Sequence, residues 1–135
     1  LELILPEGMD QQEGCLAQSM EEVYQAQVYP FWWKIAAPAD QNEWEQVTRT
    51  LDKHDPQAGV ILLGKNAPIE DFEEWFRVVR SSPYACGFAI GRSIFWQAWL
   101  DFASGKLASE KIPDIISQHY LHLIELWDSA TNQES

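Results

Sequence analysis

The sequence is poor in basic residues. It contains 9 Lys and Arg against 21 Asp and Glu, which gives a formal net charge of -12 at pH 7. Nucleic acids and anionic membrane surfaces are bound by basic faces, so this balance argues against both as partners. An anionic substrate must instead be held locally, by backbone amides, a helix N-terminus and one or two cations, because the overall field repels it.

Cysteine and long apolar runs are also scarce. The two cysteines, Cys15 and Cys86, predict no disulfide framework, and Cys86 lies in an apolar run where a buried thiol is expected. No apolar stretch approaches the roughly 18 residues of a membrane span and no signal-peptide pattern occurs, so we expect no membrane insertion and a cytoplasmic location. His119 and His122 lack a third ligand, so we predict neither a metal site nor another cofactor.

Hydrophobic residues, in contrast, are plentiful. They make up 46% of the 135 residues, which is enough for one globular core, so we expect residues 1–135 to form a single unit. The chain begins at Leu1 inside a run that reads as a β-strand and has no initiator Met. We therefore expect this unit to be part of a longer domain.

Short apolar runs predict β-strands at residues 1–5, 32–36, 59–63 and 86–90. Their starts are 31, 27 and 27 residues apart, and the segments between them have helical periodicity. This alternation indicates a parallel sheet built from βα units. The expected helices cover residues 15–27, begin at Asp40, after Pro68 and near Arg92, and end with an amphipathic helix over 109–130. Aromatic residues at helical spacing, including Trp96 and Trp99, are expected to be core.

The nearly constant length of the βα units favours an α/β fold that is the C-terminal half, strands 5–8, of a (β/α)8 barrel with one further C-terminal helix. An open doubly wound sheet is the alternative, and it usually has more varied crossovers. Half a barrel exposes two sheet edges. We therefore expect a missing N-terminal half or a second copy, and so a possible homo-oligomer, to close it.

Two charged residues stand in the predicted strands, Glu2 in the first and Lys34 in the second. Because side chains alternate along a strand, both are expected on the face opposite Trp33 and Ile35, pointing into the barrel. A lysine among apolar neighbours is a candidate nucleophile toward a carbonyl, and an adjacent carboxylate can move protons. The alternative is a structural ion pair.

The ends of the last two predicted strands carry Gly64-Lys65 and Gly91-Arg92-Ser93. Glycine lets the backbone approach a ligand closely, a helix N-terminus offers free N–H groups, and Arg92 or Lys65 adds positive charge. Phosphate sites of (β/α)8 barrels commonly form after strands 7 and 8. These residues therefore predict a phosphate site, the alternative being that the glycines only form turns and Arg92 is solvated.

Three segments together resemble a known family: Pro30-Phe31-Trp32-Trp33-Lys34, Gly59 to Gly64 with Ala67-Pro68, and Gly87 to Phe95. They are similar to the aldolase-like C-terminal domain that is fused to the sugar kinase of bacterial inositol catabolism. The late pattern of Tyr120, Leu123, Ile124 and Leu126-Trp127 resembles the end of that domain.

The resemblance implies a class I aldolase barrel related to the tagatose-bisphosphate aldolases, without a metal. Carried over by position, Glu2 is the acid/base, Lys34 forms the Schiff base, and Gly64, Gly91 and Arg92 bind phosphate. The implied reaction cleaves 2-deoxy-5-keto-gluconate 6-phosphate to dihydroxyacetone phosphate and malonate semialdehyde. Phe31, Ala36 and Lys65 depart from the family pattern, which bears on substrate specificity.

Two other functions fit the same residues. One is a non-catalytic domain that binds a phosphosugar or docks on a carbohydrate kinase. The other is a purely structural half-barrel whose role is to pair with another half.

Overall fold

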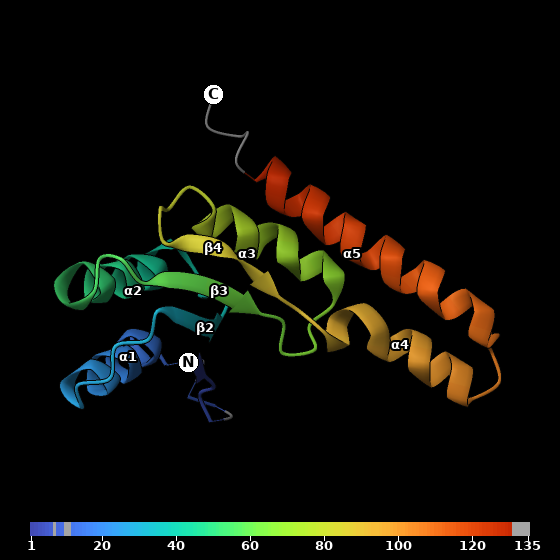
Figure 1. The fold of residues 1–135 in the computed structure, drawn as a ribbon, viewed down its shortest axis with the longest axis horizontal. Coiled ribbons are helices and arrows are strands. Elements are labelled where there is room, and N and C mark those ends of the chain that lie inside the picture. Colours follow the sequence, from blue (N-terminus) through green and yellow to red (C-terminus); the bar gives the residue numbers. More distant parts are fainter. Residues whose placement is uncertain (7, 10–11, 131–135) are drawn as a thin grey trace.

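The computed structural model describes residues 1–6, 8–9 and 12–130, and in this part of the chain it forms one parallel sheet with helices along it (Figure 1). The strands are β1 (Glu2–Leu3), β2 (Trp32–Ala36), β3 (Gly59–Leu63) and β4 (Ala85–Ala89). The helices are α1 (Cys15–Gln25), α2 (Gln41–His54), α3 (Phe72–Val79), α4 (Arg92–Ala103) and α5 (Ile112–Ser129), with 3-10 turns η1 (Ile69–Asp71) and η2 (Ser109–Lys111).

The strands lie side by side in chain order, β1-β2-β3-β4, and every pair is parallel. The predicted parallel α/β sheet is therefore confirmed. β1 is shorter than the apolar run of residues 1–5 suggested, and β4 begins one residue before the predicted start. Among the described strands, β1 and β4 each keep one unpaired edge, so closure into a barrel stays a prediction.

One face of the sheet is covered by helices. Trp33 and Ile35 of β2 and Val60 and Leu62 of β3 are buried on this face. They pack against the apolar stripes of the helices, whose buried members are Leu16, Met20 and Tyr24 of α1, Trp44, Val47 and Leu51 of α2, Phe72, Phe76 and Val79 of α3, and Leu123 of α5. The helix periodicity in the sequence therefore identified most of this core.

One helix start follows its sequence signal closely, and another lies a few residues later. Asp40 is the N-cap of α2, where its carboxylate accepts a hydrogen bond of 2.9 Å from the Glu43 amide. Pro68 comes just before η1 and is not itself helical, so α3 begins only at Phe72.

The opposite face of the sheet is open. Trp32, Lys34 and Ala36 alternate with the buried residues of β2 and are exposed or half-buried. Cys86 is also exposed, so the prediction of a buried thiol is wrong. The reason is a register shift between Val60 and Ile61, which leaves Cys86 as an extra residue in β4 on a face that no described helix covers.

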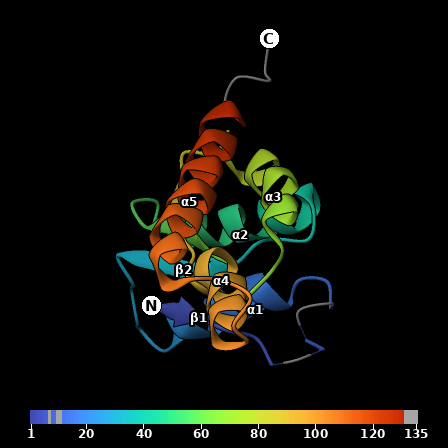
Figure 2. The same ribbon diagram turned by 90° about the vertical axis from the view of Figure 1, so that its right-hand side faces the viewer.

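The two C-terminal helices leave the sheet. α4 starts at the end of β4 and runs on past the strands, and α5 then returns along it to pack over α3 (Figures 1 and 2). Only Ile94 and Ala98 of α4 are buried, whereas Trp96 and Trp99 are 42% and 51% exposed. The prediction that these tryptophans are core is wrong, because α4 does not fold back onto the sheet.

α5 takes the position over β4 that a crossover helix normally occupies. Phe88 of β4 stacks on Phe76 of α3 at 5.2 Å between ring centroids, and Trp127 of α5 lies edge-on at 5.9 Å from Phe88. Nδ1 of His119 is hydrogen-bonded to the carbonyl oxygen of Ile94 at 2.8 Å, and this bond joins α5 to α4.

A hydrogen-bonded clamp joins α1 to α2. Glu21 lies 2.6 Å from the Lys53 amine and 2.7 Å from Nε2 of His54, and the His54 ring stacks on Tyr24. The hydrogen bond from Lys53 is the main cause that lowers the pKa of the Glu21 carboxyl below its ordinary 4.5. Burial opposes this effect, and the hydrogen bond and charge of His54 add to the lowering of the pKa.

We predict that Tyr24→Phe destabilises the chain by about 1–3 kcal/mol, because it leaves a buried donor unpaired. The Trp33 indole N–H donates a buried hydrogen bond of 2.8 Å to the Tyr24 hydroxyl. Urea unfolding followed by circular dichroism measures the change. Tyr29→Phe, at a residue that is 58% exposed, is the control and should change stability by less than about 0.5 kcal/mol. Equal effects of the two changes would contradict the prediction.

The clamp also predicts a pH dependence of stability. A pKa that is lowered on folding stabilises the fold fully above the unfolded-state pKa, and this contribution is lost as the pH falls through the folded-state pKa. Glu21→Gln should therefore lower the urea midpoint at neutral pH, and its difference from the unchanged chain should shrink as the pH falls below about 4. Urea titrations across this range test it. Glu22→Gln, whose residue forms no ion pair within the described part of the chain, should show neither effect.

Candidate functional site

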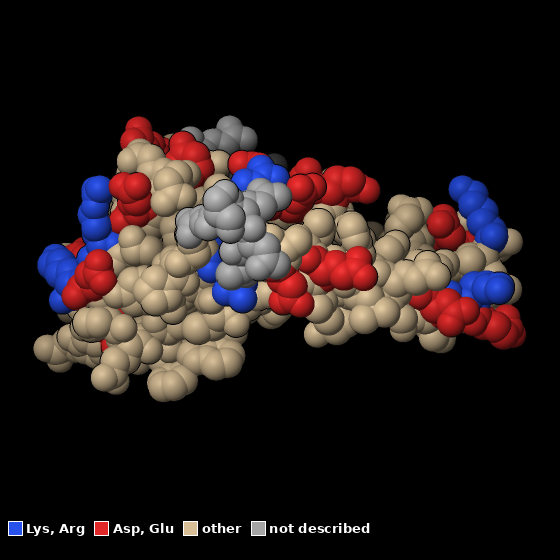
Figure 3. All heavy atoms as spheres, turned by 90° about the horizontal axis from the view of Figure 1, so that it is seen from above, with Lys and Arg blue, Asp and Glu red and all other residues tan. Residues whose placement is uncertain are grey.

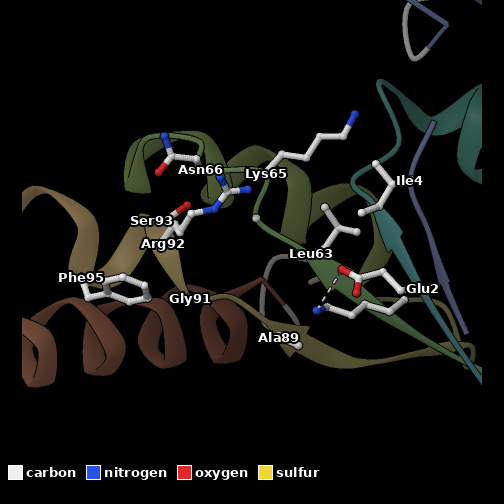
Figure 4. Close-up of a pocket in the computed structure, with 12 residues that line it drawn as sticks. Glu2, Ile4, Leu63, Lys65, Asn66, Ala89, Gly91, Arg92, Ser93 and Phe95 are labelled. Carbon is white, nitrogen blue, oxygen red and sulfur yellow. Dashed lines mark ion pairs between the residues drawn. The ribbon is translucent and has the colours of Figure 1, made fainter. Parts of the chain in front are cut away.

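Glu2 and Lys34 meet on the open face of the sheet. They are register partners on neighbouring parallel strands, and Oε1 of Glu2 lies 3.1 Å from Nζ of Lys34 (Figure 4). Both side chains point to this face because Trp33 and Ile35 are held under the helices on the other. The pairing that alternation predicts is therefore present.

The solvent exposure of Lys34 and Glu2 shows how much their ion pair can contribute to stability. The Lys34 and Glu2 side chains are 35% and 47% exposed, so desolvation of the amine is only partial in this chain. Ion pairs with this much solvent contact contribute about 0–1 kcal/mol to stability. Stability by itself therefore gives little reason for placing these two charges on neighbouring strands of the sheet.

A cavity of about 330 Å³ opens beside the pair. It lies at the carboxyl ends of the strands, which in parallel sheets is where ligands bind. At its far end are the first residues of α4 (Figure 4). The lining comprises Glu2, Ile4, Lys34, Leu63, Gly64, Lys65, Asn66, Ala89, Gly91, Arg92, Ser93 and Phe95. All the residues predicted for catalysis and for phosphate binding thus line one cavity.

The N-terminus of α4 has the features of an anion site. Gly91 occupies the N-cap and supplies no side-chain cap. The Ile94 amide donates to the Gly91 carbonyl, and the amides of Arg92 and Ser93 before it have no partner within the helix. The Ser93 hydroxyl is buried and has no hydrogen-bond partner among the described residues. The Arg92 side chain is exposed and forms no ion pair within that same part of the chain. Donors of three kinds therefore converge here with their bonding capacity unused.

Lys65 and Asn66 form the turn that follows β3. Both have positive φ angles, 46° and 63°, which Asn tolerates well. The Lys65 amine points away from the Glu2–Lys34 pair, at the rim of the cavity (Figure 4). The structure thus places Lys65 beside the site but does not direct its charge at the other polar groups.

Gly64 and Gly91 differ in how much space a side chain would have at each position. A Cβ at Gly64 would lie 3.0 Å from Ile90 Cγ2 and 3.1 Å from the Ser93 hydroxyl, so the turn after β3 packs directly on the start of α4. A Cβ at Gly91 would meet only Phe95, at an ordinary 3.5 Å. Packing therefore explains Gly64 without a ligand, whereas no steric reason requires glycine at position 91.

Five lining residues were not predicted as site residues from the sequence: Ile4, Leu63, Asn66, Ala89 and Phe95. Ile4, Leu63 and Ala89 had a signal, because strand alternation places Ile4 on the same face as Glu2, and because Leu63 and Ala89 stand near the ends of predicted strands, just before the glycine turns. The sequence signal for Asn66 was weaker: Asn follows the Gly64 turn closely and is suited to a left-handed backbone conformation. Phe95 had none, since its contact depends on where α4 goes.

The described residues contain no group of three His, Cys, Asp or Glu that is arranged to hold a metal ion. His122 lies 3.8 Å from Glu125 within α5, and His119 is used in joining α5 to α4. Neither histidine reaches the cavity lining. In the same part of the chain, no helix combines the length and the apolar character that crossing a bilayer requires.

A family model described as "Uncharacterized protein conserved in bacteria (DUF2090)" matches residues 1–131. No curated protein and no solved structure matches the chain.

The close approach at Gly64 gives a prediction. Gly64→Ala should destabilise the chain by about 1–3 kcal/mol, because the added methyl forces Ile90 or Ser93 to move. Gly91→Ala adds the same methyl at the same cavity where there is room, and should cost less than about 1 kcal/mol. Urea unfolding of the two variants measures the difference. A cost at position 91 equal to that at position 64 would contradict it.

Proposed function

We propose that this chain, which belongs to the bacterial family whose model it matches, forms the catalytic half of a class I aldolase acting on a phosphorylated keto sugar. The observation that carries the proposal is the Lys34 amine, 3.1 Å from the Glu2 carboxylate, in a cavity that also contains an uncapped helix N-terminus. Nucleophile, proton carrier and anion site are then within reach of one small substrate.

Lys34 would attack the substrate carbonyl, and loss of water would give a protonated Schiff base. Glu2 would then take the proton of the β-hydroxyl as the C–C bond breaks, the electron pair moving into an enamine on Lys34. Return of a proton to the enamine carbon and hydrolysis would release the second product and free the amine. A carboxylate 3.1 Å from the amine is within the distance that such transfers need.

The start of α4 would hold the phosphate. In (β/α)8 barrels the phosphate is often bound by the loops after the last two strands together with the N-terminus of a short extra helix. α4 fits this description, since it leads away from the sheet while α5 returns over it. This arrangement supports the finer proposal that the sheet is strands 5–8 of such a barrel, closed by an N-terminal half or a second copy.

The specific substrate rests on the resemblance of the Trp32-Trp33-Lys34 and Gly91-Arg92-Ser93 segments. We propose 2-deoxy-5-keto-gluconate 6-phosphate, cleaved to dihydroxyacetone phosphate and malonate semialdehyde in cytoplasmic myo-inositol breakdown, alongside a fused sugar kinase. The local cations suit such an anionic ligand, because a chain with a net charge of -12 has no other means of attracting it.

A second candidate is a non-catalytic domain that binds a phosphosugar. It is favoured by one observation: the unpaired Ser93 hydroxyl and the Arg92 side chain form their anion site without any contribution from Lys34. The two candidates differ in whether Lys34 reacts.

Schiff-base trapping tests the proposal. Sodium borohydride added to the full-length protein with dihydroxyacetone phosphate should attach the reduced ligand to Lys34, as read by peptide mass spectrometry. Lys34→Arg should abolish the adduct, whereas Lys53→Arg, a change outside the cavity, should leave it. Absence of an adduct on Lys34 would contradict the aldolase proposal.

Loss of cleavage, and not phosphate binding, separates the two candidates. In Lys34→Ala, an aldolase loses cleavage by a factor on the order of 10³ or more but still binds inorganic phosphate in calorimetry. A domain that only binds has no cleavage to lose, and it gives the same phosphate affinity with and without Lys34.

A further inference from the structure

One side of α4 is a continuous apolar surface with no cover in this chain. We call it the outer face of α4, and it consists of Phe95, Trp96, Trp99, Leu100 and Phe102, which are 38–51% exposed. At 100° per residue these positions form an arc beside the side of Ile94 and Ala98 that packs on α5. Phe95 and Phe102 lie next to that buried side, and Trp96 and Leu100 lie opposite it. Trp99 is near the middle of the surface.

α4 has a wide apolar arc beside a polar strip that includes Gln97 and Asp101, and an apolar helix face of this kind is normally buried against another element. α5 covers one side of α4, and the hairpin of the two helices projects beyond the sheet (Figure 1). With about 200 Å² per large side chain, the exposed part of the outer face amounts to roughly 400 Å². Apolar patches of this size on soluble proteins mark interaction sites.

We propose that the outer face of α4 is covered by the same face of a second copy, in a two-fold dimer with α4 against α4. A two-fold contact places the same patch on both sides, so a surface without charged groups at its centre is suited to meet itself. Trp99 of each copy would lie near the axis, with Phe95 and Phe102 on one flank and Trp96 and Leu100 on the other.

Charge favours a second copy at this place. Two chains of net charge -12 repel one another, and Figure 3 shows acidic side chains spread over the face that it displays. α4 carries only Arg92 and Asp101, which cancel, and the outer face itself is uncharged apart from Arg92 at its start. α4 is therefore a surface where two copies approach with little repulsion, whereas a basic partner would find its complement elsewhere.

The area of the outer face of α4 also agrees with that of a small homodimer interface. Homodimer interfaces are about 65% apolar, so roughly 400 Å² of apolar surface corresponds to about 600–700 Å² per copy. That is at the lower end of stable two-fold interfaces. We therefore expect a dimer that forms at micromolar concentration.

This contact is distinct from closure of the barrel, which would involve the open face of the sheet and the edges of β1 and β4. Phe95 belongs both to the outer face and to the cavity lining, whereas Trp99 lines no part of the cavity, so Trp99 separates this inference from the aldolase proposal. The chain offers a matched pair of residues to separate the two contacts: Trp99 on α4 is 51% exposed and Trp32 on the open sheet face is 49% exposed.

Sedimentation velocity of the full chain over a range of micromolar concentrations tests the inference. The unchanged chain should dimerise, Trp99→Asp should raise the dissociation constant at least tenfold, and Trp32→Asp should change it less than threefold. Circular dichroism confirms that each variant is folded, and Phe102→Asp replaces Trp99→Asp if the latter is not. Screening the acidic chains by raising NaCl from about 50 to 500 mM should tighten the dimer.

Three results would overturn the inference. The first is a chain that stays monomeric up to about 100 µM, which lies well above the expected dissociation constant. The second is a dimer that Trp32→Asp weakens as much as Trp99→Asp, which would place the contact on the sheet. The third is dissociation at high salt, which would indicate an interface held by ion pairs.

Discussion

The packing of Trp33, Ile35, Val60 and Leu62 under the helices is the constraint on which the rest of the molecule depends. Because side chains alternate along a strand, burying this set turns Glu2, Lys34 and their neighbours to the opposite face. Parallel pairing with Glu2 and Lys34 as register partners then brings their charged ends to 3.1 Å. The hydrophobic core thus determines where the ion pair forms.

The rest of the site comes from where strands end. β3 and β4 finish at the same edge of the sheet, so the turn at Gly64 packs on the start of α4 and encloses the cavity from one side. The acidic character of the chain makes these local donors important. In a molecule whose field repels anions, the α4 amides, Arg92 and the Ser93 hydroxyl are the groups able to hold one.

α4 shows how a correct local prediction can mislead. Its start near Arg92 and its helical character were predicted, and its aromatic residues were then assigned to the core, as helix periodicity ordinarily justifies. The helix instead continues beyond β4, and Trp99 is half exposed. Its direction is set by the Gly91 junction and by the contact with α5 through Ile94, neither of which has a periodic signature in the sequence.

The sequence by itself determined the parallel sheet, the Asp40 cap and the common face of Glu2 and Lys34. These follow from patterns that can be read along the chain: the alternation of strands and helices, the residue at a helix start, and the alternation of side chains within a strand. Only the tertiary structure decided that Cys86 is exposed at a bulge, that the Ser93 hydroxyl is buried without a partner, and that α4 leaves the sheet. These depend on how distant segments pack against one another. Periodicity specifies which side of an element is apolar, but not what covers that side.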